Sequence, residues 1–422
     1  MSSETQPAEI TETSLLDTLR VLTSVVAPTI AKGVIKRRPS VEALAQHHGL
    51  DTAALELLQD LRKKYGSDPL QLSVLLRSQV LVMDPKDVEQ VLSETPTPFG
   101  SASKEKRSAL RHFEPSNILI ADTEQRAQLR PAHEHALATN ERIHPYAGRF
   151  EQVIQEELRL LFDDVDNKPE FDLDWNTFAK AWSKITLRIA LGDSARDDKQ
   201  LINDLDDIRH RANWGFLAFT DHSKLESYQA QDSNVDWASQ VAQWLFAFDA
   251  AAMATYRALA LLGAHPEHQE KAFQEAKSGG PDRPLTRAVL LESLRLWPTT
   301  PAILRELTED HQIDGKAIAK GTGVVISTPF FHRDNEKLDF ADRLSPDQWK
   351  DKEAIPSQGL VPFSAGPARC PAHNLVPMVS GLVIDGLLAE RKIELVEPKL
   401  DPKALPGTLN NFEVKLHLTK RN

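Results

Sequence analysis

Residues 361–375 read VPFSAGPARCPAHNL, and the cysteine in this stretch, Cys370, is the only one among 422 residues. A lone thiol cannot form an intrachain disulfide, so another role is needed for it. The commonest fate of a free cysteine is a buried, inert side chain, and this is the first interpretation. The second is a metal ligand, because a thiolate is a strong, electron-rich ligand for iron.

The residues around Cys370 are compatible with the second interpretation and leave the first one open. A haem iron needs an axial ligand on a loop that approaches the porphyrin closely, and small residues permit that approach. Phe363 is expected to pack near the sulfur, and Gly366 allows a tight turn. The residues after Cys370 are predicted to open a helix whose N-terminal amides stabilise a thiolate.

Composition limits the remaining possibilities. Apolar residues make up 41% of the chain and the net charge is −11, which describes a globular protein without a nucleic-acid-binding surface. No apolar run reaches the roughly 18 residues of a membrane-spanning helix. The first 13 residues are polar and acidic, unlike a secretory signal, and are expected to be disordered. A cytoplasmic location is the expectation.

Residues 14–38 are predicted to form an amphipathic helix. Leu15, Leu19, Leu22 and Val26 recur at helical intervals, and the segment ends in three basic residues. One interpretation is a helix that packs on its own domain. The other is a weak contact with a membrane surface, with the basic residues at its edge.

The chain after residue 44 reads as one domain, so we expect an N-terminal extension over 1–44 and a single domain over 45–422. Strand signals occur in residues 69–85 and again after residue 300, and long helical segments lie between about 122 and 295. Residues 241–267 are apolar on all sides, as expected of a helix through the domain centre. The prediction is a mainly α fold with a minor β region.

Four motifs resemble those of the cytochrome P450 family, and they follow one another along the chain in the family's order. The pattern F-x-x-G-x-x-x-C from Phe363 to Cys370 is similar to the family's haem-binding signature. ESLRLWP carries Glu292 and Arg295 as E-x-x-R, and FADRLSPDQW resembles the meander, where Arg343 would complete a buried triad with that pair. AHPEHQEKA is similar to the end of the family's central helix. The resemblance covers roughly residues 45–422.

The resemblance implies a single triangular domain with haem b between the central helix and the Cys370 loop. Cys370 would be the axial ligand of the iron. The family's propionate-binding arginines match Arg305 and Arg130, while Arg126 stands where many members have tryptophan. The usual basic residue two positions before the cysteine is Ala368, with Arg369 beside it, and the usual glycine two positions after it is Ala372.

This sequence departs further from the family at the distal motif. Its A-G-x-[D/E]-T element falls on residues 246–250, so that Asp249 supplies the acid but Ala250 replaces the threonine. That threonine normally holds the water that protonates bound dioxygen, and its loss is expected to raise uncoupling. The alternative is an alignment shifted by a residue or a helix bulge. The substrate pocket implied by the resemblance is apolar and includes Phe246, Ala247, Phe248, Ile303 and Leu304.

The implied activity is that of a monooxygenase acting on an apolar small molecule with O2. The chain has no G-x-G-x-x-G loop, so electrons are expected from a separate ferredoxin or flavodoxin-type donor with its reductase. A peroxide-driven oxygenase, or a coupling or rearranging enzyme, is the alternative with the same haem-thiolate centre. A haem-binding carrier or sensor without turnover is the alternative from a different class.

Overall fold

The computed structural model describes residues 8–34, 36–72, 77–110, 118–164, 168–203, 237–280, 282–350 and 352–421. Helices dominate this part of the chain. The longer ones are α3 (Pro39–His47), α4 (Leu50–Tyr65), α5 (Pro85–Ser93), α7 (Thr123–Ala136), α8 (Ala147–Asp164), α9 (Trp175–Leu191), α12 (Trp237–Ala264), α13 (Pro266–Ser278), α14 (Pro284–Leu296) and α16 (Leu375–Glu390). The shorter ones are α1 (Leu15–Val21), the π-helical turn η1 (Leu22–Val26), α2 (Ala27–Lys32), α6 (Lys104–Leu110), α15 (Thr328–His332), and the 3₁₀ turns η2 (Asp193–Ala195), η3 (Pro346–Trp349), η4 (Pro356–Gln358) and η5 (Gly366–Ala368).

The strands form three small sheets. The largest has the order β1 (Thr11–Glu12), β2 (Leu70–Leu72), β3 (Gln79–Leu81), β9 (Gly323–Ser327), β6 (Ala302–Leu307) and β4 (Phe99–Gly100). A second sheet joins β10 (Arg391–Glu397), β11 (Lys415–Lys420) and β5 (Glu170–Asp174), and a hairpin pairs β7 (His311–Ile313) with β8 (Lys316–Ile318). The predicted mainly α fold with a minor β region is confirmed.

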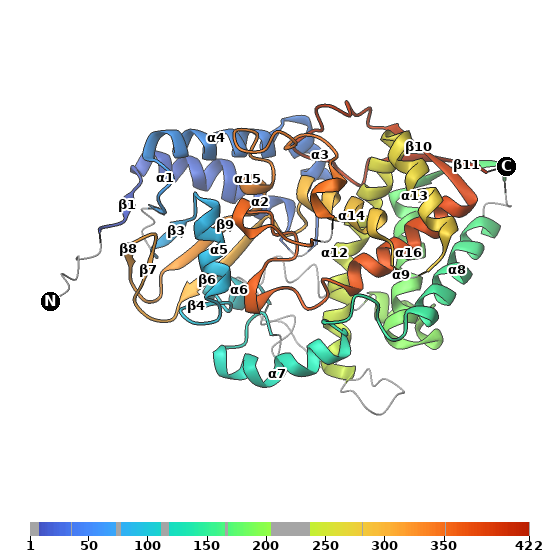
Figure 1. Ribbon diagram of the computed structural model, residues 1–422, viewed down its shortest axis with the longest axis horizontal. Coiled ribbons are helices and arrows are strands. Elements are labelled where there is room, and N and C mark those ends of the chain that lie inside the picture. The colour runs from blue at the N-terminus through green and yellow to red at the C-terminus, as the bar shows by residue number, and fades with distance from the viewer. Residues whose placement is uncertain are drawn as a thin grey trace.

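The six-stranded sheet and the main helical layer lie at opposite ends of the molecule (Figure 1). The sheet has its own apolar core with α4 and α5, and a second core gathers around α12 and α16. In α12, every residue from Ala251 to Leu262 is buried. The prediction of a helix buried through the domain centre is therefore confirmed, and Cys370 packs against the core to which this helix belongs.

Residues 8–13 are ordered, which corrects the expectation of disorder over this part of 1–13. Thr11 pairs in parallel with Leu70, and the amide of Thr13 donates to the carbonyl of Gln71 at 2.9 Å. An edge strand of the sheet supplies the backbone partners that a polar sequence lacks on its own. Residues of the expected N-terminal extension therefore contact the expected domain that begins at residue 45. The division of the chain at residues 44 and 45 stays a prediction.

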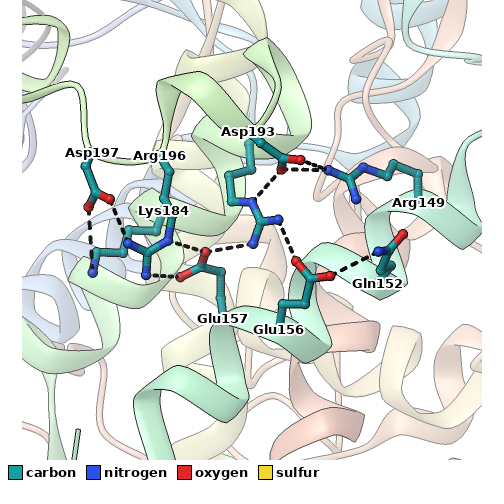
Figure 2. A network of polar contacts seen from close by, with 9 residues as sticks. Arg149, Gln152, Glu156, Glu157, Lys184, Asp193, Arg196 and Asp197 are labelled. Carbon is teal, nitrogen blue, oxygen red and sulfur yellow. Dashed lines mark hydrogen bonds and ion pairs between the residues drawn. The ribbon is translucent and has the colours of Figure 1, made fainter. Parts of the chain in front are cut away.

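A network of charged side chains fixes α9 to α8 (Figure 2). The carboxylate of Glu157 is 2% exposed and accepts hydrogen bonds from Arg188 at 2.8 Å and from Arg196 at 2.7 Å. Arg188 also binds Glu156 and Asp193, and these carboxylates raise its pKa against the effect of burial. The network holds α9 in place, and α9 in turn contacts the central helix α12.

Across the described part of the chain, none of the helices meets the length and hydropathy that a bilayer-spanning segment requires.

Candidate functional site

Cys370 ends a loop that folds back on itself. The amide of Cys370 donates to the carbonyl of Phe363 at 2.9 Å, and both side chains pack against the core around α12 and α16. Between them the turn η5 closes with a bond from the amide of Arg369 to the carbonyl of Gly366 at 3.0 Å. The loop therefore presents its sulfur from a fixed backbone, as the sequence predicted.

Gly366 allows this loop to lie close to α5. Its φ of +66° is in the left-handed region that favours glycine. A Cβ atom at this position would also collide with the backbone carbonyl of Leu92, near the end of α5. The glycine is thus required twice, by its own conformation and by the contact between two backbones.

The environment of the Cys370 thiol is mostly apolar with a few favourable charges. Burial raises the pKa of the thiol, while a hydrogen bond from the amide of Ala372 and the charges of Arg130 and Arg369 act in the opposite direction. Helix α16 begins only at Leu375. The predicted helix therefore starts one turn later than expected, and the Ala372 amide supplies the local stabilisation.

Three buried or half-buried cations lie together on α6, α7 and β6. Arg126 is 5% exposed and Arg305 is 3% exposed, and both lower the pKa of Lys106. Their hydrogen bonds go to neutral atoms: Arg126 donates to Ile118 O at 2.9 Å, Arg305 to the Thr95 hydroxyl at 3.1 Å and Lys106 to Ser101 O at 2.9 Å. Within the described residues, none of the three forms an ion pair.

The electrostatics of these cations fit an anionic ligand. Burial, followed by repulsion from neighbouring arginines, lowers the pKa of both Arg126 and Arg305 to about 10. Buried charges are normally paired, because an unpaired one loses its hydration without compensation. Two propionate groups, as on haem, would supply that compensation. The cations and the sulfur of Cys370 are the kinds of group that bind this cofactor, and their assignment to it stays a prediction.

Arg130 and Arg369 have other contacts. Arg130 forms an ion pair with Glu134 at 2.5 Å and donates to the carbonyl of Arg369 at 2.8 Å, so it supports the backbone of the Cys370 loop. The side chain of Arg369 binds Glu353. Their expected role at the propionates stays a prediction.

The E-x-x-R pair is buried as the resemblance implied, but its third member differs. Glu292 and Arg295 are both 0% exposed, and Arg295 Nε donates to Glu292 at 2.6 Å. The side chain of Arg343 is instead half exposed and donates to Asp339 O at 2.6 Å, while its own carbonyl accepts from Arg295. The expectation of a buried Arg343 side chain is corrected. The indole N–H of Trp349 donates to Glu292 at 2.7 Å and completes the group.

The distal residues lie on α12. Asp249 and Ala250 are half-buried, as is Ala247. Phe248 is 1% exposed and packs against Trp182 and Trp244, and the indole N–H of Trp182 donates to Phe248 O at 2.8 Å. The side chain of Phe246 lies outside the described residues.

Strand β6 carries two of the predicted pocket residues, Ile303 and Leu304. On β6, Ile303 shares the buried face with Arg305, and Leu304 lies on the other face. The Thr255 hydroxyl is hydrogen-bonded to Ala251 O at 2.7 Å and to the Ser380 hydroxyl at 2.8 Å, so it does not replace the missing alcohol. The assignment of the distal and pocket residues stays a prediction.

Sequence reasoning missed Lys106, Trp349 and Glu353. Trp349 lies inside the FADRLSPDQW motif, so its place beside Glu292 had a signal in the motif itself. Lys106 lies in a run of charged residues, KEKR, and nothing in that run distinguishes the lysine that turns inward. Glu353 lies 17 residues before Cys370 in sequence, and only the fold brings it to Arg369.

Comparison with known proteins finds related sequences for the C-terminal half of the chain. Residues 230–407 match the family described as Cytochrome P450. Cytochrome P450 4c3 of Drosophila melanogaster is 31% identical over 185 residues, which cover 40% of this chain and 35% of the relative. Cytochrome P450 4V2 of Homo sapiens is 30% identical over 177 residues, which cover 38% and 34%. The matched region thus spans about a third of these relatives. The family match includes Glu292, Arg295 and Cys370, and over residues 230–407 this chain is similar to the cytochrome P450 family.

Proposed function

We propose that this chain is a haem-thiolate monooxygenase that inserts one oxygen atom of O2 into a largely apolar small-molecule substrate. The observation that carries the proposal is the Cys370 loop, whose sulfur is the only thiol of the chain and is held by the backbone contacts of Phe363 and Gly366. Members of the family bind haem b, and the cations at Lys106, Arg126 and Arg305 fit its propionates.

Each group of residues has a defined task in this proposal. When bound, the haem iron supplies the redox chemistry that activates dioxygen. Cys370 would hold the haem iron through its sulfur, and the three cations would neutralise the propionates. Asp249 on α12 would exchange protons with solvent at its carboxylate on the distal side of the site, because Ala250 offers no hydroxyl. The apolar residues around Ala247 and on β6 bind the substrate and exclude water.

Electrons come from a separate ferredoxin or flavodoxin-type protein with its reductase in this proposal. The support is the sequence itself, which lacks the glycine-rich loop of a flavin or nicotinamide domain. The donor docks on the side of the molecule that carries Cys370. The cytoplasmic location inferred from the sequence stays a prediction.

Isotope-labelled dioxygen tests the proposal. The purified holoprotein is first screened with a compound library for ligands that change the haem absorbance by displacing water. A compound that binds is then incubated with the electron donor, its reductase and labelled O2. We expect one labelled oxygen atom in the product. Product that forms without label, or only when peroxide replaces the reductase and O2, contradicts the monooxygenase assignment.

A peroxide-driven enzyme is the second candidate, and the absence of an alcohol at position 250 favours it. In Ala250→Thr, a restored hydroxyl is expected to stabilise the distal water, so product formed per electron consumed stays level or rises if O2 is the oxidant. A fall in product would indicate that a substrate group carries the proton and is displaced. Unchanged coupling with both O2 and peroxide would show that position 250 does not face the iron.

A further inference from the structure

A cavity lies between helix α4, the segment 296–301 that leads from α14 to β6, and the loop 404–409. Its volume is about 220 Å³, and the central helix α12 reaches it through Arg257. Neither Cys370 nor any of the three cations on α6, α7 and β6 lines it. The cavity is therefore separate from the residues assigned above to the haem.

The interior of this cavity is apolar and its rim is polar. Trp297, Leu405 and Leu409 line it and are 0–4% exposed. Thr52 and Glu56 on α4 also line it and are exposed, so they lie where the cavity meets solvent. A ligand that fits such a space has an apolar body and a polar group that fixes its orientation.

Four cations line the cavity among the described residues, and three of them are neutralised by a carboxylate that lines it as well. The pairs are Lys32 with Asp51 at 2.5 Å, Arg37 with Glu42 at 3.6 Å and Arg333 with Asp342 at 2.6 Å. Each of these cations already has its counter-ion within the protein. The fourth cation is Arg257.

Arg257 is 5% exposed and forms no ion pair with the described residues. Its Nε donates to Leu409 O at 2.9 Å and its Nη1 donates to Trp297 O at 3.3 Å. The third nitrogen, Nη2, has no hydrogen-bond partner in this part of the chain, so it is the part of the guanidinium left to face the cavity. Burial lowers the pKa of Arg257 to about 10, and the carboxylates of Glu42 and Asp51 only partly oppose this. A buried charge of this kind is stabilised by an anion bound directly to it.

We propose that this cavity binds a small carboxylic acid, with the carboxylate on Arg257 and the apolar body against Trp297 and Leu55. A carboxylate carries one charge, which matches the one cation without a counter-ion, and its two oxygens can accept from neighbouring N–H groups of a guanidinium. A phosphate dianion would bring a second charge for which the apolar walls offer no partner. The proposal concerns a second ligand site and does not depend on the chemistry at Cys370.

Calorimetric titration of the full-length holoprotein tests the proposal, with benzoate as the acid and benzamide as its neutral analogue of similar shape. We expect saturable binding of benzoate, and binding of benzamide that is weaker by about tenfold or more because the charged hydrogen bonds are lost. The haem absorbance should stay constant as benzoate binds, because Cys370 does not line the cavity. Equal binding of the two compounds, or no binding of benzoate, overturns the proposal.

Two variants locate the bound acid. Arg257→Met removes the cation, and Leu55→Trp fills part of the cavity from α4 while Arg257 is kept, so the test does not rest on the folding of one variant. Each should weaken benzoate binding by about tenfold or more. Arg391→Met is the matched control and should keep the wild-type affinity, because Arg391 is 2% exposed and donates to a backbone carbonyl but does not line the cavity.

Haem content and thermal unfolding, measured on all three variants, establish which of them are folded. Wild-type affinity in the folded cavity variants, or an equal loss in the control, overturns the proposal. A haem absorbance change with the same midpoint as benzoate binding places the acid beside the haem instead and also overturns it.

Discussion

At Gly366 the loop that carries Cys370 has no room for a side chain. Its positive φ costs an alanine about 1–2 kcal/mol, since the Cβ of an L-residue approaches the following carbonyl. The carbonyl of Leu92 adds a second obstacle, because it belongs to the backbone and cannot rotate away. One residue thereby sets the distance between the loop and α5.

We predict that Gly366→Ala lowers the free energy of unfolding and the haem content together. The loop must shift away from Leu92, which displaces the sulfur of Cys370. Gly315→Ala is the control, because Gly315 has a φ of +73° but nothing lies within 4 Å of the position of its Cβ. Urea unfolding and haem absorbance are measured for both variants. Equal losses in Gly366→Ala and Gly315→Ala would show that glycine is needed at position 366 only for its backbone conformation and not for the contact with α5.

At the scale of elements, α14 is joined to the turn η3 through a single buried carboxylate. Glu292 accepts from Arg295 within its own helix, from the indole of Trp349 at 2.7 Å and from the amide of Ser345 at 2.6 Å. A buried charge with several donors is strongly stabilised only while all of its partners are present. The side chain of Arg343 does not contribute to this group.

We predict that Trp349→Phe destabilises the protein by about 1–3 kcal/mol, because it removes one of the two donors to the buried Oε1 of Glu292 and replaces the indole by a smaller ring. Arg343→Ala should change the free energy of unfolding by no more than about 0.5 kcal/mol, as expected of a half-exposed side chain. Urea unfolding of both variants is the measurement. The reverse order of effects would restore Arg343 as the third member of the triad.

Lys106 on α6 lies near Arg126 on α7 and Arg305 on β6, and this grouping gives a second prediction. Burial, with repulsion from Arg305 and Arg126, holds the pKa of Lys106 well below its ordinary value of 10.5. The unfolded chain therefore binds more protons at this site than the folded chain does. The free energy of unfolding of the haem-free protein should rise with pH over the range that ends near 10.5.

The Lys106→Met variant should lose this rise, because it has no proton to release. Lys104→Met, which changes an exposed lysine on the same helix, is the control and should keep the wild-type slope. Urea unfolding of the haem-free proteins at a series of alkaline pH values gives the slopes. Identical slopes in the wild type and Lys106→Met would show that Lys106 does not share a buried site with the two arginines.

The sequence predicted the parts of the fold that depend on periodicity or on a special residue. The helix α12 was apparent from its continuous apolar run, and Cys370 and Gly366 were apparent because few other residues can replace them. The inward turn of Lys106 and the outward turn of Leu15 and Leu16 could not be predicted. Both depend on which face a neighbouring element covers, and in α1 the contacts of Asp17 with α4 decide this against the hydrophobic pattern.

At the scale of the whole molecule, the chain carries a net charge of −11, but basic residues lie next to Cys370 in its loop. The sequence indicates that Arg369 and His373 form a positive face for an acidic electron donor. In the structure Glu353 binds Arg369, lies 3.2 Å from Arg287 and lies 3.6 Å from the imidazole of His373. This carboxylate offsets much of the positive charge next to Cys370.

We predict that the rate of association with an acidic ferredoxin depends weakly on salt in the wild type and more steeply in Glu353→Gln, which exposes the positive charge. Glu336→Gln is the control, because it removes one charge beside Arg62 and Lys63 in the last turn of α4. Stopped-flow reduction at several salt concentrations gives the rates. Equal salt dependence in the wild type and both variants would indicate an apolar docking surface.

The measurement that tests the central claim most directly is the absorbance of the reduced carbon monoxide complex in the wild type and in Cys370→Ser. An alcohol cannot donate to iron as a thiolate does, so the account predicts a thiolate-type spectrum in the wild type and its complete loss in the variant. The alanine variant at the same position should lose the spectrum as well. A thiolate-type spectrum that persists in Cys370→Ser would contradict the assignment of Cys370 as the haem ligand, because the chain has no other thiol.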